Sequence, residues 1–100
     1  KSISAGENSK IDLKNIIIYQ SKIGLASKDS SLVLGENILI ANTQIALASY
    51  IKKDIYESPT IKILNSKIEN SDIHFLSEED FKISYNGEEQ EKTQFDFSSL

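Results

Sequence analysis

Few residues of this chain could do chemistry, and the clearest pair is a histidine close to an aspartate. His74 is the single histidine, and it follows Asp72 by two residues. A histidine beside a carboxylate can act as a general base, but a catalytic site needs several convergent groups and a metal site needs three or more ligands. We therefore interpret His74 as an exposed structural residue, and we predict no catalytic, cofactor-binding or metal site.

Two acidic runs are the next candidates. Glu78-Glu79-Asp80 and Glu88-Glu89 supply the carboxylate oxygens that calcium prefers. Like charges that are adjacent in sequence repel one another, and the chain has no Asp-x-Asn-Gly calcium loop. We interpret both runs as solvated, charged surface.

The segment from Tyr50 to Ser58 is the best candidate for contact with a ligand. It combines aromatic faces with charged groups, a mixture that sugars or protein surfaces accept. The candidate contact residues are Tyr50, Lys52, Lys53, Asp54 and Tyr56. The alternative interpretation is that this segment is a packed loop.

The elements that must position these residues follow a repeat. Its template runs from Ile11 to Ser27, returns 22 residues later and returns again after a further 28. Eight template positions recur in all three copies: Ile11, Leu13, Asn15, Ile18, Gln20, Ile23, Leu25 and Ser27. Apolar residues alternate with period two inside each copy, which is typical of short strands with one buried face.

Both ends of the chain continue the same register. Ile3 lies 22 residues before Leu25, so residues 1–5 are predicted to form the last strand of an earlier copy. Ile83 and Tyr85 continue the third copy, and Gly87 takes the next corner. We therefore divide the chain into stacked coils over residues 1–87 and a C-terminal tail or cap over residues 88–100.

One copy cannot bury its own apolar face, so the copies must stack. Stacking predicts two interior columns, formed by Ile18, Ile40 and Ile68 and by Ile23, Ile45 and Ile73. It also predicts a ladder of side-chain amides formed by Asn15, Asn37 and Asn65. Asparagine suits this place because it tolerates the left-handed backbone of a tight corner.

The outward positions carry no cluster of carboxylates. Asp12, Leu34 and Lys62 follow one another along one stack, and Gly24, Ala46 and His74 follow one another along another. The groups that would abstract a proton and stabilise developing charge are therefore not assembled.

The second copy departs from the template at two points. Gly35 takes a position that is large and apolar elsewhere, so either the register is kept or Leu32 and Leu34 face the core, with Glu36 as an extra, bulge-like residue. The spacing then grows by six residues between Tyr50 and Ser58. Stacked repeats tolerate such a local insertion well.

The motif Ile-x-Leu-x-Asn-x-x-Ile-x-Gln-x-x-Ile-Gly-Leu at Ile11 to Leu25 resembles the coils of right-handed parallel β-helix proteins of the pectate-lyase-like class. This resemblance implies an all-β fold, a solenoid of about four coils of about 22 residues each. It also implies an exported protein family that often handles polysaccharide, and hence a place outside the cell or at its surface. A leucine-rich repeat is the competing fold, but its Leu-x-x-Leu-x-Leu-x-x-Asn order is not met.

Charge and composition exclude several partners. The net charge is −4, and the chain has eleven lysines and no arginine. An acidic surface without guanidinium groups is a poor match for nucleic acid or for an anionic membrane surface. No apolar run approaches the roughly 20 residues of a membrane-spanning helix, so we expect no membrane insertion.

These observations favour a non-catalytic segment that acts as a structural or surface-interaction module and contacts glycans. The alternative is a fragment of a polysaccharide lyase or a glycoside hydrolase. The expected partners are further coils of the same polypeptide or another copy of the chain, through coil stacking, and carbohydrate. The N-terminal end is the expected stacking surface because no cap covers it, whereas Phe95 and Phe97 are expected to cap the last coil.

Overall fold

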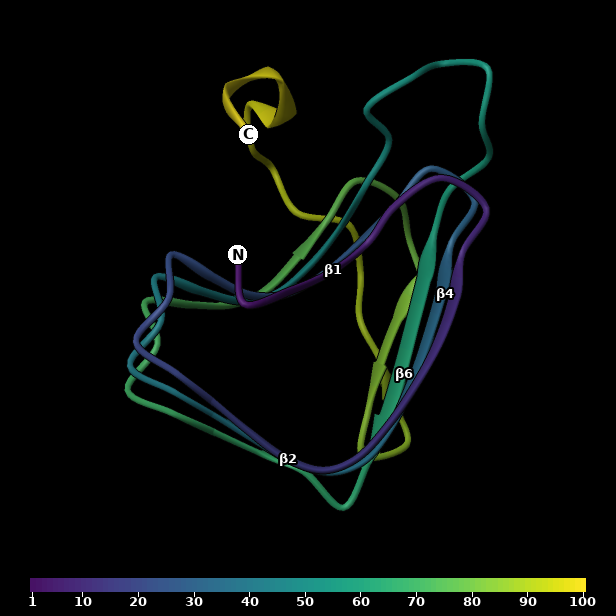
Figure 1. Ribbon diagram of the computed structural model, residues 1–100. Helices are drawn as coiled ribbons and strands as arrows, with labels where there is room; N and C mark the ends of the chain where they lie inside the picture. Colours follow the sequence, from purple (N-terminus) through teal and green to yellow (C-terminus); the bar gives the residue numbers. More distant parts are fainter.

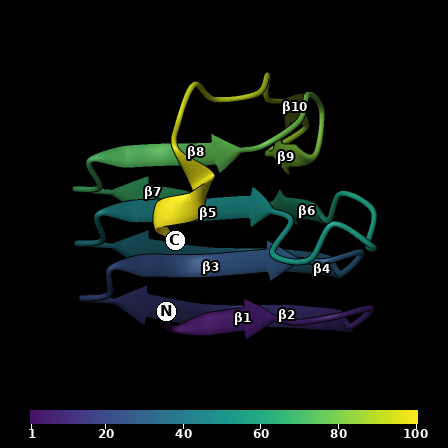
Figure 2. The ribbon, with the colours of Figure 1, turned by 90° about the horizontal axis from the view of Figure 1, so that it is seen from above.

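The chain winds repeatedly around a three-cornered interior, and successive windings stack on one another (Figure 1, Figure 2). This computed structural model describes residues 1–100. Its elements are β1 (Ile3–Ala5), β2 (Lys10–Tyr19), β3 (Ile23–Lys28), β4 (Leu32–Ala41), β5 (Ile45–Tyr50), β6 (Thr60–Leu64), β7 (Lys67–Glu69), β8 (Ile73–Ser77), β9 (Ile83–Tyr85), β10 (Glu88–Glu89) and η1 (Phe97–Ser99). No helix of the chain is long and apolar enough to cross a membrane.

The strands form two sheets in which equivalent strands of successive windings lie side by side. One sheet has the order β1-β3-β5-β8, and the other has the order β10-β9-β6-β4-β2, with β7 also paired to β4. The predicted register is confirmed, because Ile18 pairs with Ile40 and Ile40 pairs with Ile68, both in parallel. Ile3 pairs with Leu25, so the N-terminal segment forms a strand in register with the template.

The predicted right-handed parallel β-helix, a solenoid of about four 22-residue coils, is wrong. The structure is a small all-β domain of two sheets with extents of 33 × 24 × 23 Å. One of the sheets is mixed, because β10 runs antiparallel to β9. The windings are also uneven: the register advances by 22 residues from β2 to β4 and by 28 residues from β4 to β6.

The last winding ends because the chain turns back on itself. Asn86 and Gly87 have φ angles of 50° and 86°. A two-residue turn with both φ angles positive joins antiparallel strands whose twist it matches, which is why Asn-Gly favours hairpins. Gly87 therefore belongs to a hairpin and not to another corner of the repeat.

The two ten-residue strands bend at asparagines. Asn15 in β2 and Asn37 in β4 have φ angles of 56° and 57°, in the left-handed region. The pairing of β2 with β4 skips these two residues and resumes at Ile16 with Ile38. Each asparagine therefore turns one strand around a corner while both halves stay paired.

The interior is filled by side chains from both sheets. Its buried members are Ala5, Ile18, Leu25, Val33, Ile38, Ile40, Ala46, Leu47, Ile61, Ile63 and Ile83. Gly35 keeps the template register, because it pairs with Leu13 and with Ile63. A Cβ at this glycine would lie 2.8 Å from a methyl carbon of Ile63. The alternative with an extra residue at Glu36 is thus wrong, and glycine leaves the space that Ile63 fills.

A second apolar cluster lies on the outer face of the β1-β3-β5-β8 sheet. It contains Ile23, Ala26, Ile45, Ala48, Tyr50 and Leu76, with Ile73, Phe97 and Leu100 packed against it. The column of Ile23, Ile45 and Ile73 therefore belongs to this outer cluster, which corrects the prediction that it is interior. The prediction was right that Ile23 and Ile45 are buried, at 3% and 5% exposure.

The outer column arises because the strands change direction at the following residue. A Cβ at Gly24 would lie 2.9 Å from a methyl carbon of Ile40, so this position faces the interior. Ala46 is also part of the interior cluster, whereas His74 is exposed. The prediction that Gly24 and Ala46 face outward is wrong.

The C-terminal segment crosses the outer face of the sheet, over β8 and β5 (Figure 2). It first follows β8, where the Thr93 N–H donates to the Ser77 carbonyl at 2.8 Å. The Phe97 ring then packs on Tyr50, with 6.5 Å between ring centroids. Phe97 thus covers the side of the stack and not its last winding, contrary to the prediction.

Candidate functional site

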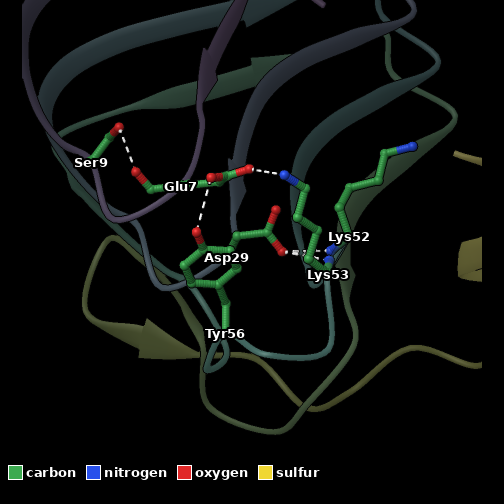
Figure 3. Close-up of polar contacts among 6 residues, drawn as sticks. All are labelled: Glu7, Ser9, Asp29, Lys52, Lys53 and Tyr56. Carbon is green, nitrogen blue, oxygen red and sulfur yellow. Dashed lines mark hydrogen bonds and ion pairs between the residues drawn. The ribbon is translucent and has the colours of Figure 1, made fainter.

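The corner loop between β5 and β6 is held by a buried carboxylate. Asp29 is 3% exposed, and its Oδ1 accepts hydrogen bonds from the backbone N–H groups of Lys52 at 2.6 Å and Lys53 at 3.0 Å (Figure 3). A buried carboxylate is costly unless hydrogen bonds compensate for its lost hydration. These two bonds do so, and they also fix the start of the loop.

A second carboxylate, Glu7, ties the loop to the turn before β2. Lys53 Nζ donates to Glu7 Oε1, and the Tyr56 hydroxyl donates to Glu7 Oε2 at 2.9 Å (Figure 3). The bond from Lys53, and then that from Tyr56, holds the pKa of Glu7 below its usual range. The same carboxylate raises the pKa of Lys53 and the pKa of Tyr56.

Three further contacts anchor the ends of this loop. The Ile51 N–H donates to Glu78 Oε1 at 2.8 Å, and Ser49 Oγ donates to the Pro59 carbonyl at 2.8 Å. Lys52 Nζ reaches the carbonyl oxygen of Leu100 at 2.7 Å. The loop is therefore tethered at its beginning, middle and end.

Tyr50 lies beneath the C-terminal segment and is 1% exposed. Its hydroxyl has no hydrogen-bond partner, and Lys1 Nζ lies 5.7 Å from the ring centroid. Burial raises the pKa of this phenol, although the nearby Lys28 and Lys52 oppose the rise. The ring acts as part of the outer apolar cluster.

The predicted ligand-contact residues are thus mostly engaged within the protein. Tyr50 is buried, while Lys52, Lys53 and Tyr56 make the contacts described above. Asp54 alone of the five is an exposed side chain without an internal hydrogen bond. Ligand contact through this loop stays a prediction, and the packed-loop alternative agrees with the geometry.

The other candidate residues make structural contacts. The His74 ring lies edge-on to Phe75, with 6.0 Å between centroids. In the acidic runs, Glu78 holds the backbone of Ile51, and Asp80 Oδ1 accepts from the Lys92 N–H at 2.8 Å. No group of three His, Cys, Asp or Glu side chains is arranged to hold a metal ion.

The predicted asparagine ladder has one rung. Asn37 Nδ2 donates to Asn15 Oδ1 at 2.7 Å. Asn65 has the expected left-handed φ of 49° but no hydrogen bond to Asn37. In its place, Ser66 Oγ accepts from the Ile38 N–H at 3.0 Å, so the prediction that Asn37 is bonded on both sides is wrong.

A second ladder occupies the opposite corner, where β2, β4 and β7 end. Gln20, Asn42 and Asn70 have left-handed φ angles of 52°, 55° and 51°. Asn70 Nδ2 donates to Asn42 Oδ1 at 2.6 Å, and the hydroxyls of Thr43 and Ser71 lie 2.7 Å apart. Hydrogen bonds along the stack therefore fix the amides and hydroxyls of this corner.

This corner is hollowed into an open, entirely polar groove of about 770 Å³. We name it the corner groove; its lining residues are Gln20, Ser21, Lys22, Asn42, Thr43, Gln44, Asn70 and Asp72. None of them is hydrophobic. Tyr19, which directly precedes Gln20, is 56% exposed.

Four exposed side chains of the corner groove have hydrogen-bonding groups without a partner in the protein: Gln20, Lys22, Gln44 and Asp72. Two are neutral amides, and the other two are one ammonium and one carboxylate, so the formal charges balance. Such a lining can donate to and accept from a hydroxyl-rich ligand.

Sequence signals for this corner were available in part. Gln20, Asn42 and Asn70 are among the recurring positions, and the residues after them are Ser21, Thr43 and Ser71, all hydroxyl-bearing. Asp29 and Glu7 have no counterparts in the repeat, so their tethering roles left no sequence signal.

Comparison with models of known protein families, with curated proteins and with solved structures found no match. The resemblance to pectate-lyase-like proteins therefore stays a prediction.

Proposed function

We propose that this chain is a non-catalytic surface-interaction module that contacts neutral glycan chains through the corner groove. One observation carries the proposal: the groove is lined by eight polar residues and no hydrophobic one, and four of its side chains have free hydrogen-bonding groups. Pockets for drug-like molecules are mostly apolar, so this lining favours a ligand whose own surface is rich in hydroxyls.

The charge of the groove favours a neutral ligand. Lys22 and Asp72 offset each other, and the whole chain is acidic at −4. An acidic polysaccharide would be repelled by the protein as a whole and would find a single ammonium group in the groove. The exposed ring of Tyr19 at the rim adds a flat face of the kind that packs against sugar rings. As part of this proposal, the protein acts outside the cell or at its surface.

Calorimetric titration with cellohexaose, and separately with hexagalacturonate, tests the proposal. We expect binding of the neutral probe, and about tenfold weaker binding by the Gln44→Ala, Asp72→Ala double variant, because two hydrogen bonds are lost. The matched control is Gln94→Ala, Asp54→Ala, which removes the same groups from two exposed, unbonded side chains elsewhere.

The outcomes are distinct. Equal binding by the wild type and the groove variant would contradict the corner groove as the site. Loss of binding in the control would instead move the site to the loop that carries Asp54. Cleavage of either oligosaccharide, abolished by His74→Ala, would support the alternative that the chain is a fragment of a polysaccharide lyase or a glycoside hydrolase.

A further inference from the structure

The N-terminal end of the stack exposes two unpaired strand edges. β2 is the last strand of one sheet and β1 is the last strand of the other, and both lie at the same end of the molecule (Figure 2). The open side of β2 extends over ten residues. Open edges of this length pair readily with another strand unless they are covered.

Alternate residues of β2 direct their backbone groups to this open side. The Ser9 carbonyl accepts from the Leu32 N–H of β4 at 2.8 Å, so it points into the sheet. Backbone groups alternate in direction along a strand. The N–H and C=O groups of Lys10, Asp12 and Lys14 therefore point away from β4 and lack partners in the chain.

Apolar side chains line the same end. Ile3, Ile11, Leu13 and Ile16 pack against the interior cluster but remain partly exposed. On the outer face of β2, Ile17 is 72% exposed and Tyr19 is 56% exposed. A strand added to β2 would extend the sheet and cover part of this surface.

The opposite end of the stack is largely covered. β10 lies antiparallel against β9. The edge of β8 is held by the C-terminal segment, where Ser77 and Thr93 exchange hydrogen bonds at 2.8 Å and 3.1 Å. Head-to-tail stacking would thus place an open edge on a covered one, whereas two N-terminal edges match each other.

We propose that two copies of this chain associate through their β2 strands, paired antiparallel about a twofold axis. The exposed side chains of Lys10, Asp12 and Lys14 alternate in charge. With Asp12 opposite either Lys10 or Lys14 of the second copy, symmetry creates two opposite-charge pairs. The register with Asp12 opposite itself sets like charges against each other and is disfavoured. The pairing uses each edge once, so assembly stops at the dimer.

Sedimentation equilibrium from about 1 µM to about 1 mM tests this proposal. We expect a concentration-dependent dimer, and about tenfold weaker association for Asp12→Lys, which places lysine opposite lysine in every one of these registers. Asp54→Lys is the matched control, because it makes the same change in net charge at an exposed loop residue and should dimerise as the wild type does.

Two further variants separate edge pairing from general effects of charge. Asp12→Pro removes an N–H that points away from β4, so the variant should keep the wild-type melting temperature but become monomeric. The triple variant Lys10→Asp, Asp12→Lys, Lys14→Asp restores the alternation with reversed signs and should dimerise again. A wild type that stays monomeric throughout, a dimer unaffected by Asp12→Pro, or open-ended oligomers would each overturn the proposal.

Discussion

Asparagine makes most of the corners in this protein. Seven of its eleven non-glycine residues with positive φ are asparagines: Asn8, Asn15, Asn37, Asn42, Asn65, Asn70 and Asn86. Asparagine visits the left-handed region more readily than other residues with a side chain, because its short amide can hydrogen-bond locally. This is why a chain with four glycines and one proline can still turn sharply at every winding.

Substitutions at Asn37 should separate its two roles. Asn37→Gly loses the bond to Asn15 but keeps the left-handed backbone at little cost, whereas Asn37→Ala loses both. We expect the alanine variant to be less stable than the glycine variant by about 1 kcal/mol, measured by urea unfolding. Asn65, which has the same backbone but no bond to Asn37, should show the same difference between alanine and glycine. Equal stabilities for the two Asn37 variants would contradict this account of the corner.

The contact between Glu7, Lys53 and Tyr56 should make stability depend on acid. The pKa of Glu7 is lower in the folded protein than in the unfolded chain, so the unfolded state binds a proton first as the pH falls. The stabilisation is complete above the unfolded value of about 4.3 and is lost as the pH falls through the lower folded pKa. Glu7→Gln should therefore flatten the melting temperature between pH 5 and pH 3. Identical acid dependence in variant and wild type would contradict the role of Glu7.

At the scale of strands, the repeat was sufficient to predict which residues pair. Equal spacing of Ile18, Ile40 and Ile68 places them side by side because parallel strands keep a constant offset. The repeat could not predict how the chain leaves this pattern. The Asn86-Gly87 hairpin depends on two local residues, and the alternating pattern says nothing of a sheet that is apolar on both faces.

The outer cluster is such a second apolar face, and the C-terminal segment covers it. Phe97 packs on Tyr50, so Phe97→Ala should expose the outer face, lower the stability by about 2 kcal/mol and increase the binding of an apolar dye. The control is Ile55→Ala, because Ile55 is 82% exposed and should contribute little. If Phe97→Ala changed neither stability nor dye binding, the C-terminal segment would not be a cover.

On the scale of the whole molecule, the binding features lie at separate places. The corner groove runs across the windings at the corner where β2, β4 and β7 end, the tethered loop protrudes between β5 and β6, and the open edge of β2 is at the N-terminal end. Sequence reasoning selected the loop because its composition is varied. It could not foresee that Glu7 and Asp29, distant in sequence, occupy the loop's polar groups, nor that stacked corner residues form a groove.

The central claim is that the corner groove binds neutral glycan, and NMR chemical-shift mapping with cellohexaose tests it most directly. The account predicts that the amide signals that shift on addition of the oligosaccharide cluster at Gln20 to Lys22, Asn42 to Gln44 and Asn70 to Asp72. Shifts confined to the loop between β5 and β6, or no shifts at saturating oligosaccharide, would contradict it.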